Sequence, residues 1–419
     1  MISKLRIHAG VAILLALGLA TAAPRPAQGQ SAGLPGEWLA QYASARTLGF
    51  GNAFVATAND PFGVLWNPAG LSGMDQNEFR FETARLFEDT AIHGASLAIP
   101  GSRLPSFGIT MLSLRSGDFE RTNELNDDLG SFHEGETAYL FTVSRAFTTR
   151  LAIGATAKYV QQTIEDFSGG GFGADVGATM VVMPGVKVGA AVSNLGGPAI
   201  KLRDTEEPYP VLVRGGVAVE VLGGRGLVAA QFDQSEGLGS SLHGGAEYWV
   251  QPGLALRVGY DDEHGTGGFT YRFAPRYQID YGVAEHELGM VHRVGLSMRF
   301  GGFFASSQAE PAVFSPTGER AVTRIALNSR TKSEPEEWSL DIVNKADEVV
   351  RKFGGKGQPP SHLQWDGKDE TGLPLPDGVY RYRLTVRDRE ARVVMGPVRT
   401  VEIATGGPQG EIPVLPVQP

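Results

Sequence analysis

The chain has 419 residues, a formal net charge of −9, no cysteine and 56 glycines. The lack of cysteine excludes disulfides, a thiolate metal site and acylation of a lipoprotein cysteine. The acidic balance, with 37 basic and 46 acidic residues, disfavours binding to a nucleic-acid backbone. A hydrophobic content of 42% is low for a bundle of membrane helices, but it suits a β-barrel in which half of each strand faces a polar lumen.

Residues 1–29 have the organisation of a Sec signal peptide. Basic residues precede an apolar run from Val11 to Leu19 and small residues follow it, with cleavage expected after Ala22 or after Gly29. The run is too short to cross about 30 Å of hydrocarbon as a helix. No later segment is long and apolar enough to do so either. We therefore expect an exported protein without a helical membrane span.

Residues 30–76 lack the alternation of strands and carry a compact motif. It comprises a glycine-rich stretch with Gly49 and Gly51, the turn Asn59-Asp60-Pro61, and the run Trp66-Asn67-Pro68-Ala69-Gly70-Leu71. Pro68 pushes Asn67 toward an extended conformation, while Gly70 permits a tight bend. The motif is either a structural turn that seats this segment or part of a plug or gate, and both interpretations stay open.

The order and spacing of this motif resemble the opening of the PorV/PorQ family, whose barrels are similar to the fatty-acid transporter FadL. The resemblance covers residues 44–300, although Asn59-Asp60-Pro61 departs slightly from the commoner Asp-Asp and Asp-Pro variants. It implies that residues 30–76 enter the lumen of an outer-membrane barrel, where their movement would admit a hydrophobic ligand.

Residues 77–300 predict an antiparallel transmembrane barrel of about 14 strands, because short segments alternate apolar and polar residues. In the segments Leu254–Tyr260 and Tyr277–Val283 the large apolar residues share one face, which would meet lipid. The opposite face would carry charges into the lumen, where we expect neighbouring pairs to form ion pairs rather than an ion-selective path. These charged residues are Glu247, Arg257, Arg272, Asp280 and Arg299.

Short Pro/Gly turns alternate with longer polar connections along this region. Loops at one end and turns at the other are typical of bacterial barrels, whose turns are periplasmic. The longer connections are expected at 116–134, 166–173, 194–210, 234–240 and 261–267. Both ends of the barrel would then lie in the periplasm.

The segment Arg293–Phe300 resembles the C-terminal assembly signal of outer-membrane barrels. Gly295, Met298 and Phe300 supply its glycine, its alternating hydrophobic residue and its terminal aromatic residue. The resemblance implies that the barrel closes at Phe300 and is inserted by the barrel assembly machinery.

Composition changes after the barrel, with a linker expected at 301–311, a small β-sandwich at 312–405 and a disordered tail at 406–419. The sandwich resembles the Ig-like module of flagellar hook-capping (FlgD-type) proteins, on the residues Trp365, Asp366, Gly367, Gly372, Asp377, Gly378 and Tyr380. Asp366, Asp369 and Asp388 suggest calcium, but the dense acidic loop of a calcium site is missing.

We expect no enzyme, no cofactor and no metal site. The sequence has no G-x-S-x-G elbow, no P-loop and no H-E-x-x-H. His243 follows Ser240 and Ser241, but no orienting Asn or Asp is evident.

The resemblance implies two competing functions in the bacterial outer membrane, with the Ig-like domain in the periplasm. The first is support of protein export and surface attachment of the type IX secretion kind, with secretion components or cargo proteins as partners. The alternative is passive transport of long-chain fatty acids or other hydrophobic small molecules. Membrane lipid is a partner in both and nucleic acid in neither, and a structural tie to the cell wall would rest on the Ig-like domain alone.

Overall fold

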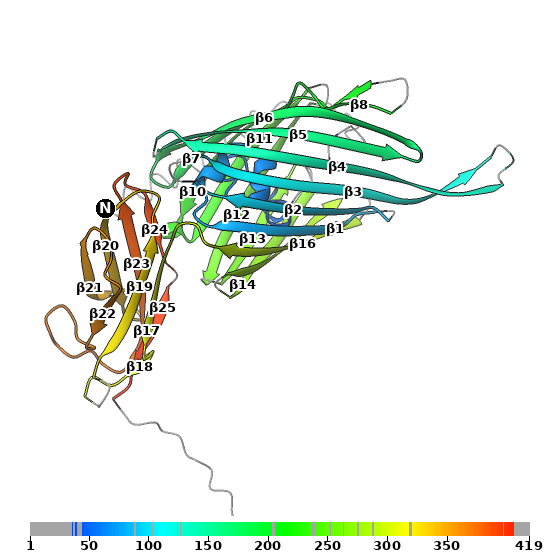
Figure 1. Cartoon of the computed structure of the whole chain (residues 1–419). Helices are drawn as coiled ribbons and strands as arrows, with labels where there is room; N and C mark the ends of the chain where they lie inside the picture. The colour runs from blue at the N-terminus through cyan, green and yellow to red at the C-terminus, as the bar shows by residue number, and fades with distance from the viewer. Residues whose placement is uncertain are drawn as a thin grey trace, which may run out of the picture. The chain divides into compact units, whose positions relative to one another are not determined.

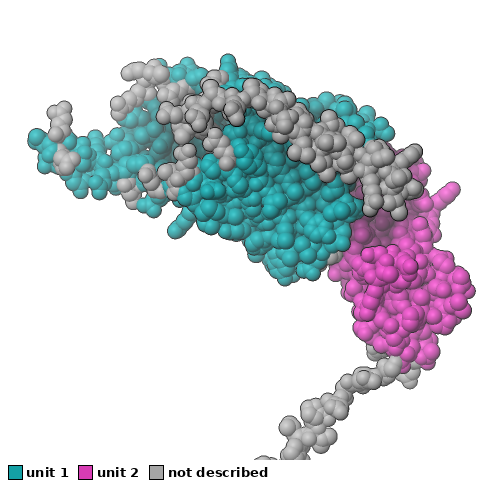
Figure 2. Space-filling model, turned by 180° about the vertical axis from the view of Figure 1, so that it is seen from behind, with its two compact units in different colours: residues 1–301 teal, residues 302–419 magenta. Residues whose placement is uncertain are grey.

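The computed structural model describes residues 36, 38–39 and 44–405, and the chain divides into two compact units, residues 1–301 and 302–419 (Figure 2). Within 44–405 the description leaves out 88, 102–103, 124, 126, 149, 203–205, 237–238, 252, 263, 275, 287–288, 318–320 and 397. The expected signal peptide, its cleavage site and the expected tail at 406–419 lie outside the described residues.

Within the described residues, fourteen antiparallel strands close into a barrel (Figure 1). They are β1 (Asn77–Arg85), β2 (Ala91–Ile99), β3 (Ser106–Thr122), β4 (Asp128–Ala146), β5 (Leu151–Ile164), β6 (Phe167–Met183), β7 (Val186–Leu195), β10 (Leu212–Val221), β11 (Gly226–Ser235), β12 (Gly239–Gln251), β13 (Leu254–Asp261), β14 (His264–Ala274), β15 (Tyr277–His286) and β16 (Gly289–Phe300). The ring closes where β16 pairs with β1 and Phe300 lies opposite Asn77. The all-β fold class with a 14-stranded barrel is therefore confirmed.

Alternation of side chains sets the two faces of the barrel wall. On β1, Phe79 and Phe81 are 41% and 42% exposed on the outer face, whereas Arg80 between them is 0% exposed on the inner face. This is the period of two expected of a strand with different surroundings on each side. None of the described helices is long and apolar enough to cross a membrane.

The strands reach further into the predicted loops than expected. β3 and β4 stay paired out to Thr122 opposite Asp128, so much of 116–134 is a hairpin that runs beyond its neighbours (Figure 1). β6 likewise begins at Phe167, inside the connection expected at 166–173. Backbone pairing does not require apolar residues outside the lipid zone, which explains why the polarity of these segments misled the prediction. The connection at 194–210 does leave the strand pairing of the barrel wall and holds the small hairpin of β8 (Ala199–Lys201) and β9 (Glu206–Pro208).

The N-terminal segment, residues 44–76, lies inside the barrel as α3 (Ala45–Gly49), η1 (Pro61–Leu65) and η2 (Pro68–Gly73), drawn in blue in Figure 1. A proline starts each 3₁₀ helix, and the side chains of Asp60 and Asn67 cap them by accepting the N–H of Gly63 and of Ala69. The helices of this segment are short because its prolines and glycines interrupt regular helical hydrogen bonding.

The C-terminal unit contains two main sheets around one apolar core. The first has the order β17 (Phe304–Glu310), β19 (Thr323–Arg330), β22 (His362–Trp365), and the second has β18 (Val313–Phe314), β25 (Arg399–Ile403), β23 (Gly378–Asp388), β20 (Pro335–Val343), β21 (Val349–Lys356), with β24 (Val393–Met395) paired to β23. Most of the segment 301–311, which we expected to be a linker, is instead strand β17. Its alanines Ala305 and Ala309 lie on one face and are buried in this core. Small residues made the strand look like a linker in the sequence.

The residues of the Ig-like motif surround the centre of that core. Trp365 is fully buried and meets Phe314 and Tyr380 edge to face, with ring centroids 5.5 and 5.6 Å apart. Gly367 and Gly372 have φ of +73° and +84°, which favours glycine. The remaining motif residues make hydrogen bonds in turns. Asp366 accepts one from the N–H of Lys368, and Asp377, next to Gly378, accepts one from the N–H of Thr405. The Tyr380 hydroxyl donates to the carbonyl of Pro376. The motif thus builds a core and its turns, and the Ig-like assignment stays a prediction.

Candidate functional site

Inward-facing glycines form a nearly continuous ring where the N-terminal segment touches the barrel wall. An added Cβ would lie 2.2 Å from the Phe50 carbonyl oxygen at Gly245, and 2.3 Å from that of Ala45 at Gly282. At Gly189 it would lie 2.3 Å from the Val55 oxygen. The wall therefore lacks side chains where the backbone and side chains of residues 44–76, which we call the plug, need the room. We call this set the glycine ring: Gly94, Gly108, Gly154, Gly177, Gly189, Gly216, Gly245, Gly259, Gly268 and Gly282.

The N-terminal motif supplies the groups that fit this ring. Asn67 Nδ2 donates to the carbonyls of Val55 and Ala178 at 2.9 and 3.0 Å, which ties the plug to β6. An added Cβ at Gly70 would lie 2.0 Å from the Ala58 oxygen, so the turn requires glycine. Three other motif residues make contacts within the segment: Trp66 Nε1 donates to the Asn52 carbonyl, and Asn59 and Asp60 face Arg46. The rest contact the barrel wall: Gly49 lies against Gly268, Gly51 against Gly244, Pro68 and Ala69 against Gly154, and Leu71 against Gly108. These contacts place the motif in the lumen and suit both a seat and a gate.

A network of buried charges lines one side of the lumen. Arg80 pairs with Glu82 at 2.6 Å and with Asp280 at 2.9 Å. Arg257 pairs with Glu247 at 2.6 Å and with Asp280 at 3.3 Å, so Asp280 joins two arginines. We call this side, on β1, β12, β13 and β15, the charged wall. Such buried pairs need each other, because one partner left alone would be an uncompensated charge.

The five lumen charges expected from the sequence fall into two groups. Glu247, Arg257 and Asp280 meet in the charged wall. Arg272 and Arg299 lie nearer the strand ends, where both donate to Gln278, at 2.9 and 3.1 Å. Sequence reasoning missed the contribution of β1, which carries Glu78, Arg80 and Glu82 at alternate positions. That alternation of charged residues is the signal in the sequence that would have placed these three side chains in the lumen.

A second part of the lumen, on β2 to β5, carries a cluster of apolar side chains, which we call the apolar wall; polar side chains such as Thr110, Thr142 and the ion-paired Lys158 are buried on the same face of these strands. The apolar wall consists of inward side chains of β2 to β5: Ile92, Leu112, Leu114, Ala138, Leu140 and Val160. Trp38, Leu39 and Phe62 of the N-terminal region pack into one cluster with them, as do Ile200 of β8 and Tyr209 beyond β9. The apolar wall is therefore covered by apolar side chains of the chain itself.

One buried carboxylate, Glu136 of β4, borders the apolar wall. Its Oε2 accepts hydrogen bonds from Trp38 Nε1 and, at 2.9 Å, from the hydroxyl of Tyr209. Its Oε1 accepts from Gln162 Nε2 at 3.0 Å, and the same Nε2 donates to Glu134. The ring of Tyr209 lies against Gly36, where an added Cβ would be 2.2 Å from Cδ2. Glu136 thus holds the N-terminal region and the β8–β9 connection over the apolar wall.

His243 does have an orienting aspartate, contrary to the sequence analysis. Its Nδ1 lies 2.6 Å from Asp261 Oδ1 and its Nε2 lies 3.1 Å from Ser241 Oγ and 3.6 Å from Asp233. Asp261 comes from the next strand, a pairing that the sequence did not reveal. Since Asp261 also accepts a hydrogen bond from Asn52 at 2.6 Å, we interpret this cluster as an anchor for the plug.

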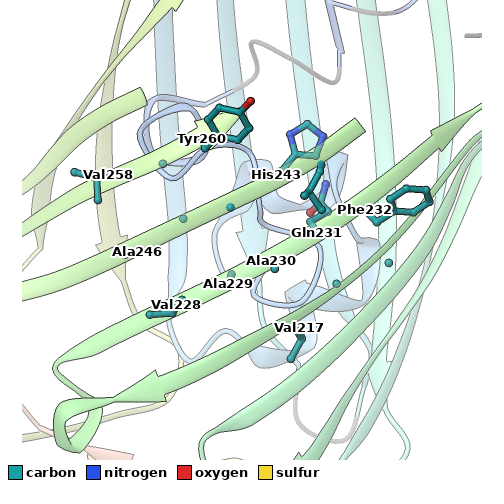
Figure 3. A pocket seen from close by; sticks show the side chains of 16 residues that line it. Val217, Val228, Ala229, Ala230, Gln231, Phe232, His243, Ala246, Val258 and Tyr260 are labelled. Carbon is teal, nitrogen blue, oxygen red and sulfur yellow. The ribbon is translucent and has the colours of Figure 1, made fainter. Parts of the chain in front are cut away.

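A shallow apolar depression of about 590 Å³ lies on the outer face of β10 to β13 (Figure 3). Exposed side chains rim a floor of small residues: the rim has Val228, Phe232, Val258 and Tyr260, and the floor has Gly215, Ala230, Gly244 and Ala246. Behind this floor Gly51 of the plug contacts the backbone of Gly244 and Tyr260. In a membrane this face would meet hydrocarbon, which the depression suits.

The three aspartates considered for calcium each bind groups of the chain itself, in separate turns of the C-terminal unit. Hydrogen bonds from Thr371 and the N–H of Leu373 lower the pKa of Asp369. Burial raises the pKa of Asp388, but hydrogen bonds from Arg392 and Ser333 outweigh it and leave that pKa below its usual value. Asp366 lies 3.6 Å from Lys368. No group of three or more His, Asp or Glu side chains that could hold a metal occurs in the described part of the chain.

No protein-family model matches the sequence, and no curated protein matches it. Among solved structures, the chain is similar to a ΔS2S3 mutant of the monoaromatic hydrocarbon channel TodX, with a TM-score of 0.51 and 13% identity over 61% of this chain and 99% of that one. Weaker similarities are to the toluene transporter TodX of Pseudomonas putida (TM-score 0.46, 14% identity, 61% of this chain and 96% of that one) and to a FadL homologue of Pseudomonas aeruginosa (0.45, 11%, 62% and 98%).

The first similarity and the strand topology define the class of the N-terminal unit: it is a closed 14-stranded antiparallel β-barrel with the fold of that solved channel. Barrels of this kind are the structures that cross bacterial outer membranes with strands. Membership of the PorV/PorQ family stays a prediction.

Proposed function

We propose that this protein is an outer-membrane channel for the passive entry of hydrophobic small molecules. The observation that carries the proposal is the apolar wall inside the lumen, where Leu112, Ala138 and Val160 are fully buried. A channel for water and ions would have a polar lining, because apolar groups facing water are unfavourable. A hydrophobic solute would replace the chain's own covering side chains, Trp38 and Tyr209 among them, and the solved hydrocarbon channel of similar fold supports this use of the barrel.

The same proposal includes the location. The C-terminal unit follows Phe300, at the barrel end with the short turns, and such turns are periplasmic in bacterial barrels. We therefore place the barrel in the outer membrane and residues 302–419 in the periplasm. Gly295, Met298 and Phe300 fall in β16, the closing strand, where an assembly signal would be read.

Support of protein export is the second candidate. Two observations favour it: the motif around Asn67 that resembles the PorV/PorQ family, and a C-terminal unit that would offer a periplasmic surface to secretion components or cargo. Neither observation accounts for the apolar cluster inside the lumen, which is why we rank this function below transport.

Deletion of the gene separates the two functions. We expect the deletion strain to take up a hydrophobic compound such as toluene more slowly, with an unchanged set of secreted and surface proteins, and the intact gene to restore uptake. A strain with normal uptake and surface proteins stranded in the periplasm would refute the transport proposal and support export.

A further inference from the structure

We infer that the preferred solute is an aromatic compound with a hydrogen-bond donor, of the phenol or indole class, and that Glu136 selects it. This inference rests on the proposed transport function and names its substrate class. It starts from the groups that fill the apolar wall in this structure.

Two aromatic side chains of the chain itself occupy the position that a solute would take. Trp38 carries an indole and Tyr209 a phenol, both are buried in the cluster of the apolar wall, and each has one donor. Both donors point to the same atom, Glu136 Oε2. The site thus already binds an apolar ring with one donor, from two separate parts of the chain.

Displacement of these rings leaves Glu136 in need of a donor. Its Oε1 keeps the hydrogen bond from Gln162, but Oε2 loses both of its donors, Trp38 Nε1 and the Tyr209 hydroxyl. An unpaired buried acceptor is unfavourable, and more so when it is charged. A phenol or an indole would restore the bond, whereas a hydrocarbon of the same shape would leave Oε2 unpaired.

The same carboxylate argues against fatty acids as the preferred solute. Glu136 and Glu134 lie close enough for Gln162 Nε2 to donate to both at 3.0 Å. A solute carboxylate at this position would bring a further negative charge without a donor, and like charges in a poorly hydrated site repel strongly.

Binding of three probes that share an ethylbenzene skeleton to the purified full-length protein tests this inference. The probes are 4-ethylphenol, ethylbenzene and 4-ethylbenzoate, titrated calorimetrically in detergent. We expect 4-ethylphenol to bind about tenfold more tightly than ethylbenzene, which corresponds to one hydrogen bond to a charged group. 4-Ethylbenzoate should bind most weakly.

Two variants of Glu136 assign the preference to this side chain. Glu136→Leu should remove the advantage of 4-ethylphenol while ethylbenzene still binds, and Glu136→Gln should keep part of that advantage and improve binding of 4-ethylbenzoate. Glu206→Gln, at an exposed carboxylate of β9, is the matched control and should behave as wild type. Heat-dependent gel mobility checks that each variant keeps its barrel.

The outcomes separate the inference from the function on which it rests. Equal affinity for 4-ethylphenol and ethylbenzene in the wild type, or a preference that survives Glu136→Leu, would overturn the inference and leave hydrophobic transport standing. If none of the three probes binds, the proposed function fails and the inference fails with it.

Discussion

The adjacent glycines Gly244 and Gly245 on β12 show that the plug fits only where the inward position has no Cβ atom. Gly245 faces the lumen, where an added Cβ would lie 2.2 Å from the Phe50 oxygen. Gly244 faces outward, and the nearest atom to its added Cβ is the Ala229 oxygen at 4.0 Å. The two positions share a strand and differ in the face they present.

This pair makes a prediction for the residue scale. Gly245→Ala should force Phe50 away from the wall, at a cost typical of overpacking, about 1–3 kcal/mol. Limited proteolysis of the folded barrel should then cut within residues 44–76 faster than in wild type. Gly244→Ala is the matched control and should leave the rate unchanged; equal rates for both variants would show that the plug does not rely on the glycine ring.

Residue types gave part of the site from sequence alone. Alternation identified Glu247, Arg257 and Asp280 as inward charges, because a charge on the lipid face would cost several kcal/mol. The glycine ring was not recognised, since a glycine on a strand does not reveal that another segment approaches it. Glu136 and Tyr209 were also missed, because their contact joins parts of the chain 73 residues apart.

Elements were predicted best where their surroundings impose a pattern. The barrel strands follow from a wall with lipid on one side and lumen on the other, and their number and closure are confirmed. The outer part of the β3–β4 hairpin and strand β17 were missed. Each has only a few of the large apolar residues by which strands were identified, Phe119, Leu129 and Phe132 in the hairpin and Phe304 in β17, so backbone pairing with a neighbour decides their structure.

The turn after β23 makes a prediction for the element scale. Asp388 is 1% exposed and accepts hydrogen bonds from the N–H groups of Glu390 and Arg392 and from Arg392 Nε. Because its pKa is lowered in the folded unit, its stabilisation is present above the pKa of the unfolded chain and is lost as pH falls through the folded value.

Asp388→Asn should therefore lower the free energy of unfolding of the C-terminal unit by about 1–3 kcal/mol at pH 7. The difference from wild type should shrink as the medium is acidified below the usual aspartate pKa. Urea titration of the full-length protein measures this difference, with the unfolding of residues 302–405 detected by their proteolysis. Glu336→Gln, at an exposed site, is the control. A difference that stays constant down to pH 2 would exclude the ionised carboxylate as its cause.

At the scale of the whole barrel, the N-terminal segment contacts both the charged wall and the apolar wall of the lumen. Arg46 of that segment lies 3.6 Å from Glu247 of the charged wall, and Phe62 packs in the cluster of the apolar wall. These contacts are non-covalent, since the chain has no cysteine. The sequence suggested a plug through its motif, but the recognition of a charged and an apolar wall required the pairing of distant strands.

Permeation through a cross-linked barrel tests the central claim, that hydrophobic solutes pass through the lumen, together with the interpretation of the N-terminal segment as its gate. Asn52 Nδ2 and Asp261 Oδ2 are 2.6 Å apart, so Asn52→Cys and Asp261→Cys place two thiols, in a chain without others, between plug and wall. In proteoliposomes, joining them with a short bifunctional thiol reagent should reduce 4-ethylphenol entry to the level of empty vesicles. The same variant without reagent, and each single variant with it, should conduct; undiminished entry through the cross-linked barrel would contradict the account.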